Sequence, residues 1–444
     1  MSIQTSLLAQ DRKHLLHPLH HPETHKSPLI ISSGDGILLR TVEGQEYIDG
    51  LAGLWNVLIG HGNEELARVA QIQMETIAYC SNYTGSANIP AIELSEKLAG
   101  FAYPNLSTTY FASGGAEANE SAFKTVRYYW KRKGKPKKVK IIARMDAYHG
   151  VTLGAMSATG IPAYWHMFEP RLPNFLHIPS PNPFRYQGDL QTNETVGMAA
   201  ARALEEVILR EEPDTVGGLI AEPVQGAGGV IVPPDDYFPR VREVCDRYNI
   251  LLIADEVITG FGRTGEWFAL KHWGIQPDIM TFAKGITSGY LPLSGIQISD
   301  DIYEVIVKAP PEQTWMHANT YSGHPACCAV AIKNLEILEC QKLVQRAKER
   351  GRQMLSRLTT LKEFTCVGDV RGLGLMCAVE FVSDRDTKEP AGIGEKVRNA
   401  CIDRGLFTRI KGDILMLAPP LIITEEDVDK IVQILRESID SVAL

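Results

Sequence analysis

The sequence lacks the features that mark membrane, secreted and nucleic-acid-binding proteins. No apolar stretch approaches the roughly 20 residues that span a bilayer. The N-terminus has no cationic start followed by a long apolar core, as a signal peptide would. The net charge of −8 argues against nucleic acid as the main partner. We therefore expect a cytoplasmic protein that acts on neither nucleic acid nor membranes.

Cysteine pairs of the C-x-x-C type are also absent, as are internal repeats and low-complexity segments. Most of the eight cysteines lie in apolar contexts, which favours buried, reduced thiols over disulfides or a zinc site. They are Cys80, Cys245, Cys327, Cys328, Cys340, Cys366, Cys377 and Cys401.

The N-terminal segment is rich in histidine and proline. Pro18, Pro22 and Pro28 prevent a regular helix beyond about Leu16. A metal site is conceivable, but no cysteine or carboxylate shell accompanies the histidines, so an ordered, partly extended arm is favoured. The role of this cluster stays open. It comprises His14, His17, His20, His21 and His25.

Short apolar runs alternate with helical patterns from about residue 66 to residue 300. The runs are continuously apolar, which is typical of parallel strands covered on both faces. They include Thr108–Ala112, Val139–Ala143, Gly218–Ala221 and Ile250–Ala254. Helical patterns at Leu204–Leu209 and Val241–Tyr248 predict crossover helices. A doubly wound, mainly parallel sheet follows from this alternation.

The two ends of the chain predict a smaller α/β domain. Residues 36–49 have the pattern of a β-hairpin. After Pro325 the pattern predicts one long helix from Ala326 to about Arg357. Strands near 367–370 and 373–381, a helix at 393–404, a strand at 414–417 and a helix at 425–440 follow. We expect an N-terminal arm and hairpin (1–65) that joins the small domain, a large cofactor-binding domain (66–325) and the C-terminal small domain (326–444).

Lys284 and Asp255 are the most informative pair in the chain. Lys284 follows an apolar strand, where an amine can condense with a carbonyl, and Asp255 ends the preceding apolar strand, where a carboxylate needs a buried cation. Pyridoxal phosphate offers both an aldehyde and a pyridinium nitrogen. An apolar run followed by Asp255-Glu256 is also found in nucleoside triphosphatases, but the required G-x-x-x-x-G-K-[ST] motif is absent.

Three further motifs fit the same chemistry. Ser113-Gly114-Gly115 opens a helix after a strand, where small residues let a phosphate approach the backbone N–H groups. Tyr148 follows another strand and could stack on a planar cofactor. Glu222 ends the strand before the Asp255 strand, so both acids are expected at one sheet edge, where such sheets bind ligands.

The ordered set of motifs resembles the class III pyridoxal-phosphate aminotransferases, from about Leu29 to Val442. The motifs are Ser113-Gly114-Gly115, Tyr148-His149-Gly150, Glu222-Pro223, Asp255-Glu256-Val257, Lys284 and Asn319-Thr320-Tyr321-Ser322-Gly323-His324-Pro325. Within this class, residues 49–55 (DGLAGLW), 409–413 (RIKGD) and 418–421 (APPL) resemble the pyruvate-dependent ω-aminotransferases. These include amine:pyruvate, β-alanine:pyruvate and 4-aminobutyrate:pyruvate enzymes. The resemblance implies a type I pyridoxal-phosphate fold and a ping-pong transfer of an amino group.

The resemblance also assigns roles to individual residues. Lys284 binds the cofactor aldehyde covalently, Asp255 binds the ring nitrogen, and Tyr148 and Val257 pack on the two ring faces. The phosphate is bound by Ser113, Gly114, Gly115 and the Thr320 of a partner subunit, which implies a homodimer or a dimer of dimers. Glu222 lies near the ring edge. Trp55 and Tyr148 line the substrate pocket. Arg409, on the loop before Gly412-Asp413, binds a carboxylate and moves away for an apolar amine.

Three departures from the class bear on the oxo-acid acceptor. Val151, Ala227 and Met416 stand where 2-oxoglutarate-dependent or ornithine-type relatives often carry charged residues. A distal carboxylate would then lack a partner, at a cost of about a few kcal/mol, so pyruvate is favoured over 2-oxoglutarate. A 2-oxoglutarate-using 4-aminobutyrate or diamine aminotransferase, or a decarboxylating or mutase enzyme of the same fold, remains an alternative. The donor, and dimer against tetramer, stay open.

Overall fold

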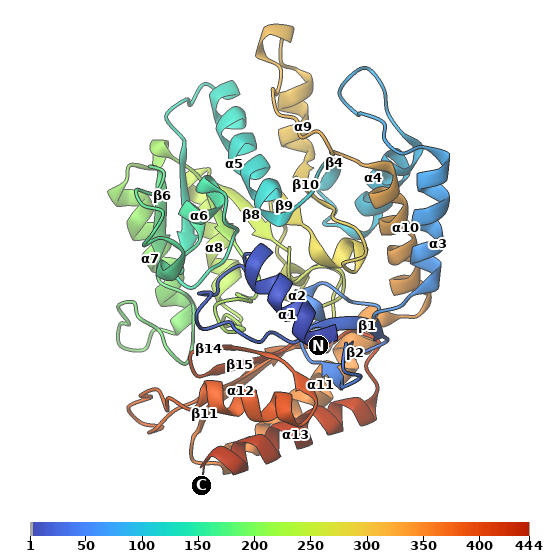
Figure 1. The fold of residues 1–444 in the computed structure, drawn as a ribbon. Helices are drawn as coiled ribbons and strands as arrows, with labels where there is room; N and C mark the ends of the chain where they lie inside the picture. Colours follow the sequence, from blue (N-terminus) through green and yellow to red (C-terminus); the bar gives the residue numbers. More distant parts are fainter. Residues whose placement is uncertain (1–2, 444) are drawn as a thin grey trace.

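A computed structural model describes residues 3–443 of the chain, which form three β-sheets with helices around them (Figure 1). The largest sheet occupies the upper body in this view, and most of the C-terminal segment lies below it. The predicted α/β architecture, with a large mainly parallel sheet, is confirmed.

The large sheet has seven strands in the order β4-β10-β9-β8-β7-β5-β6. Only β10 runs antiparallel to its neighbours, β4 and β9, whereas the other pairs are parallel. Every residue of β7 and β8 is buried, as their continuous apolarity predicts. The strands are β4 (Leu106–Ala112), β5 (Lys140–Arg144), β6 (Phe175–Ile178), β7 (Val216–Ala221), β8 (Leu251–Asp255), β9 (Ile279–Phe282) and β10 (Ser294–Ser299).

Helices surround this sheet and present apolar residues to it. On α5, for example, Ala118, Ala122 and Val126 recur at helical spacing and are fully buried. The helices are α3 (Glu64–Thr76), α4 (Ile89–Phe101), α5 (Gly115–Arg132), α6 (Leu153–Ala158), α7 (Val196–Arg210), α8 (Tyr237–Tyr248), α9 (Asp300–Val307) and α10 (Pro325–Cys340). The helices cover the faces of the sheet with their apolar sides. The loops that carry the polar motifs lie at the carboxyl ends of the strands.

Two four-stranded sheets lie beside the large one. One, β11-β12-β15-β14, is antiparallel throughout. The other, β1-β2-β3-β13, joins the predicted N-terminal hairpin to the C-terminal segment, because β3 and β13 pair in parallel. The elements are β1 (Ile31–Asp35), β2 (Leu38–Thr41), β3 (Glu46–Asp49), α2 (Ala52–Trp55), α11 (Leu343–Thr359), β11 (Val367–Leu373), β12 (Met376–Phe381), α12 (Gly394–Asp403), β13 (Leu406–Phe407), β14 (Arg409–Lys411), β15 (Ile414–Leu417) and α13 (Glu425–Ala443).

Three expectations from the sequence are wrong in detail. The single helix expected from Ala326 to about Arg357 is two helices, α10 and α11, because Lys342 adopts a left-handed conformation (φ 52°) between them. Strand β4, read as parallel, pairs only with the antiparallel β10. Arg409, expected on a loop, belongs to strand β14.

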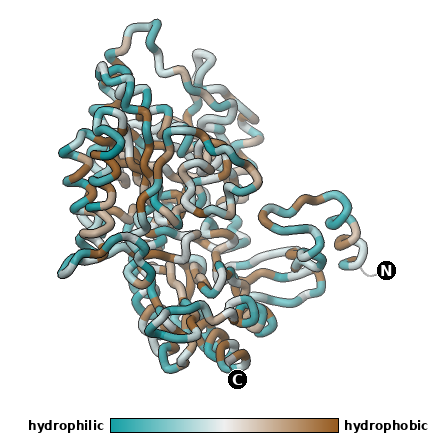
Figure 2. Tube along the Cα trace, turned by 90° about the vertical axis from the view of Figure 1, so that its left-hand side faces the viewer, coloured by the Kyte–Doolittle hydropathy of each residue, from teal (hydrophilic) through white to brown (hydrophobic). Residues whose placement is uncertain are grey.

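The N-terminal arm begins with α1 (Ile3–His14), none of whose residues is buried. Figure 2 shows this segment standing off from the body of the molecule. Its histidines contact one another: the rings of His20 and His25 stack with centroids 4.3 Å apart, and His17 hydrogen-bonds to Asp11. Within residues 3–443 no helix is both long and apolar enough to cross a bilayer.

Candidate active site

Four segments meet at the carboxyl edge of the large sheet. Ala221 of β7 pairs with Ala254 of β8, so Glu222 and Asp255 end neighbouring strands side by side. Tyr148 follows β5, and Lys284 follows β9. Together they line a cavity of about 130 Å³. Its other lining residues are Gly115, Ala116, Asn119, His149, Gly150, Val151, Val257 and Ile258.

Asp255 is nearly inaccessible, with 3% of its surface exposed. Its Oδ2 accepts hydrogen bonds from the Nδ1 of His149 (2.8 Å) and the Nδ2 of Asn119 (2.9 Å), and Oδ1 accepts one from the backbone N–H of Val257 (3.2 Å). Burial alone raises the pKa of Asp255, but these hydrogen bonds and the charge of His149 outweigh it and hold the pKa below its usual value. The group is therefore a stable carboxylate that faces the cavity.

His149 and Asn119 were not singled out as functional residues from the sequence. Asn119 also donates to the carbonyl of His149 (2.7 Å), so the two side chains form one support for Asp255. His149 directly follows Tyr148 in the motif that was recognised, and this position was the available signal. The sequence does not show that the loop after β5 folds back onto the end of β8, where His149 contacts Asp255.

Lys284 combines a strained backbone with an amine whose pKa is lowered. Its φ of 47° lies in the left-handed region, which non-glycine residues rarely adopt outside functional sites. Burial lowers the pKa of the Lys284 amine, Asp255 and Glu222 oppose this, and the positive charge of Arg409 adds to it, with a net lowering. A lowered pKa leaves more of the amine unprotonated and able to attack a carbonyl.

Glu222 links the segments on either side of the cavity. Its Oε1 accepts a hydrogen bond from the N–H of Tyr148 and its Oε2 accepts one from the N–H of Gly226, both at 2.9 Å. Burial raises the pKa of Glu222, and Asp255 contributes to this. The Glu222 side chain thus holds together the backbone at Tyr148 and the backbone at Gly226.

A second cavity of about 370 Å³ adjoins the first and shares Gly115, Val257 and Lys284 with it. It lies at the start of the 18-residue helix α5, whose N-cap Gly114 has no side chain to satisfy the free N–H groups. Such a helix start favours a bound anion. Ser113 also lines this cavity, so the three residues predicted to bind phosphate lie together.

Arg409, Trp55 and Thr320 lie outside the linings of these two cavities. Arg409 is half-buried on β14, opposite Met416, and its charge acts on both Tyr148 and Lys284. Within the described residues its side chain has no hydrogen-bond or ion-pair partner. Trp55 is 2% exposed and packs in an apolar cluster with Ile258 and Met416. Thr320 is exposed, and its carbonyl accepts a hydrogen bond from Tyr79.

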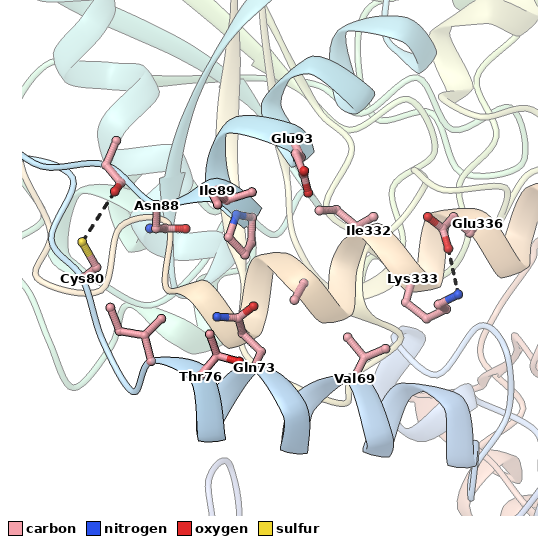
Figure 3. A pocket seen from close by; sticks show the side chains of 14 residues that line it. Val69, Gln73, Thr76, Cys80, Asn88, Ile89, Glu93, Ile332, Lys333 and Glu336 are labelled. Atoms are coloured by element: carbon pink, nitrogen blue, oxygen red, sulfur yellow. Dashed lines mark hydrogen bonds and ion pairs between the residues drawn. The ribbon is translucent and has the colours of Figure 1, made fainter.

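A larger cavity lies elsewhere, between α3, α4 and α10 (Figure 3). It measures about 620 Å³ and is lined mainly by apolar side chains such as Val69, Ile89 and Ile332. Its lysine, Lys333, is paired with Glu336 at 2.8 Å. Because it holds none of the residues of the Lys284–Asp255 set, we place the active site at the smaller cavity.

Comparison with known proteins identifies the family. Residues 20–439 match the family model "Aminotransferase class-III". The chain belongs to the class III aminotransferases. This aminotransferase is 38% identical to a putrescine–pyruvate aminotransferase from Pseudomonas aeruginosa, over 98% of the chain and 96% of that protein. It is also 38% identical to a diaminobutyrate–2-oxoglutarate transaminase from Halomonas elongata, over 100% and 97%.

Solved structures place the fold among ω-transaminases. An (S)-enantioselective ω-transaminase from Thermomicrobium roseum superposes with a TM-score of 0.95 at 46% identity, covering 100% of this chain and 99% of that one. An ω-transaminase from Pseudomonas jessenii in complex with PMP gives 0.94 at 38% identity, over 100% and 98%. The aminotransferase therefore has the type I pyridoxal-phosphate fold, and its cofactor is pyridoxal 5′-phosphate.

The residues present fit that cofactor. A stable buried carboxylate, Asp255, faces the cavity and can pair with a pyridinium nitrogen. Lys284 offers an amine of lowered pKa from the same wall. The uncapped start of α5 opens into the adjoining cavity and suits a phosphate. The two cavities are contiguous through shared residues, as a ring joined to a phosphate requires.

Proposed function

We propose that this aminotransferase moves an amino group from an ω-amino acid or an amine to pyruvate. The observation that carries the proposal is the charge distribution around the Lys284–Asp255 cavity. Arg409, whose side chain has no hydrogen-bond or ion-pair partner within residues 3–443, acts electrostatically on its residues, while Val151 forms part of its wall. The putrescine–pyruvate relative and the ω-transaminase structures support the same reaction class.

The residues would act as follows. Bound cofactor would supply an aldehyde and an electron-withdrawing ring. Lys284 would hold the cofactor through that aldehyde, and its amine, once free, would move a proton to and from the substrate carbon. Asp255, kept ionised by His149 and Asn119, would pair with the protonated ring nitrogen. Tyr148 and Val257, which line the cavity, would lie against the ring.

The choice of pyruvate as the acceptor rests on three positions that carry uncharged side chains in this chain. Val151 lines the cavity, Ala227 is half-buried and Met416 is fully buried. None can pair with the second carboxylate of 2-oxoglutarate, whereas Arg409 alone suffices for the single carboxylate of pyruvate. The 2-oxoglutarate-dependent relative of equal identity makes that acid the second candidate.

We further propose a cytoplasmic homodimer or dimer of dimers, in which Thr320 completes the phosphate site of the neighbouring subunit. Its exposure on this chain supports the assignment, because it lines neither of the two site cavities of its own subunit. The domain limits at residues 65/66 and 325/326 are part of the same proposal. The parallel pairing of β3 with β13 supports joining the N-terminal hairpin to the small domain.

A donor panel tests the function. The cofactor-loaded enzyme is incubated with pyruvate and, in turn, 4-aminobutyrate, β-alanine, taurine, putrescine and a monoamine, and alanine and carbon dioxide are measured. Alanine should form with at least one donor, in equal amount to the aldehyde or ketone product, without carbon dioxide. Release of carbon dioxide, or isomerised substrate with no alanine, would assign the chain to the decarboxylating or mutase alternative.

A further inference from the structure

Three cations lie on the small sheet β11-β12-β15-β14 at its contact with the large domain: Arg371 on β11, and Arg409 and Lys411 on β14. Arg409 and Lys411 are two residues apart on one strand, so their side chains point to the same face. They pair with Met416 and Ile414 across the ladder. The position of one therefore constrains the position of the other.

Two of the three cations are fully engaged. Arg371 binds Asp369 and Glu380 and also donates to the carbonyls of Gly229 and Val230. Lys411 donates from Nζ to the Oδ1 of Asp146 and to the carbonyl of Gly228, both at 3.0 Å. By contrast, the side chain of Arg409 has no hydrogen-bond or ion-pair partner within residues 3–443.

The partners of Lys411 belong to the two loops that form the active site. Asp146 lies two residues before Tyr148, in a left-handed conformation (φ 61°). Gly228 lies two residues after Gly226, whose N–H binds Glu222. The loops touch here, since a Cβ on Gly228 would lie 2.4 Å from the carbonyl oxygen of Asp146. The ammonium of Lys411 thus joins both loops to β14.

We propose that Lys411 is a positioning residue that, through Asp146 and Gly228, fixes β14 and with it Arg409 against the Tyr148 side of the active site. The inference rests on the proposed role of Arg409 as the cation that binds a substrate carboxylate. A guanidinium binds a carboxylate in a fork of fixed geometry, so a small displacement of β14 weakens that contact strongly. A donor without a carboxylate does not depend on it.

The test compares a carboxylate substrate with one that has none. Lys411→Met should lower kcat/KM for pyruvate about tenfold, mainly through KM, and leave the half-reaction with hexylamine within about twofold. Asp146→Asn should give a selective loss of the same kind, smaller because Lys411 keeps its hydrogen bond to the Gly228 carbonyl. The double variant should be no worse than Lys411→Met alone, because Asp146 acts here only through Lys411. Lys411→Arg, which can still reach Asp146, should restore most of the pyruvate activity.

A matched control is the ion pair of Lys348 on α11 with Glu266. It has the same length, 3.0 Å, and similar side-chain exposure (37% and 34%, against 33% and 38% for Lys411 and Asp146). Lys348→Met should leave both substrates within about twofold. This pair lies away from β14, so a loss there would indicate a general effect of breaking a surface ion pair.

Four outcomes would overturn the proposal. If Lys411→Met lowers pyruvate activity but Asp146→Asn does not, Lys411 binds the substrate directly. If both variants affect pyruvate and hexylamine equally, their role is only structural. If Arg409→Ala lowers pyruvate activity while Lys411→Met does not, the positioning role alone is wrong. An Arg409→Ala enzyme that keeps its pyruvate activity would instead refute the carboxylate role of Arg409, and the positioning role with it.

Discussion

Lys284 is held in an environment that is unfavourable for an ordinary lysine. Its backbone is left-handed, and burial lowers the pKa of its amine despite two nearby carboxylates. Both features are costs to the fold that the proposed role of Lys284 explains, because only an unprotonated amine attacks an aldehyde. Replacing such a residue should therefore raise the stability of the fold while it abolishes activity.

Lys284→Met should abolish multiple turnover and the visible absorbance of the lysine-bound cofactor, yet raise the unfolding midpoint of the cofactor-free protein near neutral pH. The folded-state pKa lies below the unfolded value, so protonated Lys284 destabilises the fold. This penalty is full below the folded pKa and fades as pH rises toward the unfolded value. Thermal melts of both proteins across that range should therefore converge at high pH. Turnover comparable to that of the natural enzyme would refute the assignment of Lys284.

Asp255→Asn should slow transamination by orders of magnitude while the cofactor still binds, because an amide cannot keep the ring nitrogen protonated. The natural enzyme should be insensitive to chelators. Initial rates with and without EDTA, and cofactor binding followed by absorbance, give the comparison. Loss of natural activity on chelation, with an Asn variant that stays fast, would mean that Asp255 holds a metal ion.

At this scale, sequence reasoning identified residues that the structure brings together at the candidate site, but it missed the side chains that support them. Lys284, Asp255 and Glu222 were predictable because a charged residue at the end of an apolar strand needs a reason to be there. His149 and Asn119 were not, because their roles depend on contacts between the β5 loop, helix α5 and the end of β8. A motif indicates which residues are present, whereas a hydrogen bond between distant segments requires the fold.

At the scale of elements, the start of α5 gives a test of the phosphate site. A Cβ at Gly114 would meet no atom within 4 Å, and the backbone there is extended (φ −142°), so Gly114→Val should be tolerated by the fold. If phosphate binds over this helix start, however, the added methyl groups occupy its place. Equilibrium dialysis should show weaker cofactor binding with an unchanged melting temperature of the cofactor-free protein.

The exposed Gly100 near the end of α4, which is equally open, is the control for this change. Gly100→Ala should leave cofactor affinity unaltered. Unchanged affinity in the Gly114→Val enzyme would place the phosphate away from α5.

Elements with strong apolar patterns were predicted within a few residues, and those without such patterns were not. Strands β7 and β8 are buried on both faces, and their continuously apolar sequences predict this burial. The two-residue strand β13 exists because β3 lies beside it, which no local pattern records. The break between α10 and α11 depends on one left-handed residue, Lys342, whose side chain does not require it. Arg409 was placed on a loop for a similar reason, since β14 has only three residues.

For the whole molecule, large apolar side chains are exposed on and after α3, at the start of α4 and in the segment that contains Thr320, and such surface is available for contact with another subunit. They include Ile72, Met74, Ile77, Tyr79, Tyr83, Ile89, Ile92, Met316 and Tyr321. Light scattering should therefore detect a dimer or a dimer of dimers in the active, cofactor-loaded enzyme. An active monomer at working concentration would contradict this.

Subunit mixing tests whether Thr320 acts on the neighbouring site. The Lys284→Ala variant should have no activity of its own, and Thr320→Val should bind cofactor weakly. When the two are unfolded and refolded together, a mixed dimer contains one site with both natural residues. Activity at limiting cofactor should then exceed that of either parent. If Thr320 serves its own subunit, no site has both residues and mixing restores nothing.

The central claim about the whole enzyme, that it is an aminotransferase directed to pyruvate, is tested most directly by competition. Equal concentrations of pyruvate and 2-oxoglutarate are offered to the enzyme with a limiting amine donor, and the initial rates of alanine and glutamate formation are measured. Their ratio equals the ratio of the two kcat/KM values. With Arg409 as the unpaired cation and Val151 on the cavity wall, alanine should exceed glutamate at least about tenfold, about 1.4 kcal/mol. Equal amounts of alanine and glutamate would contradict the account.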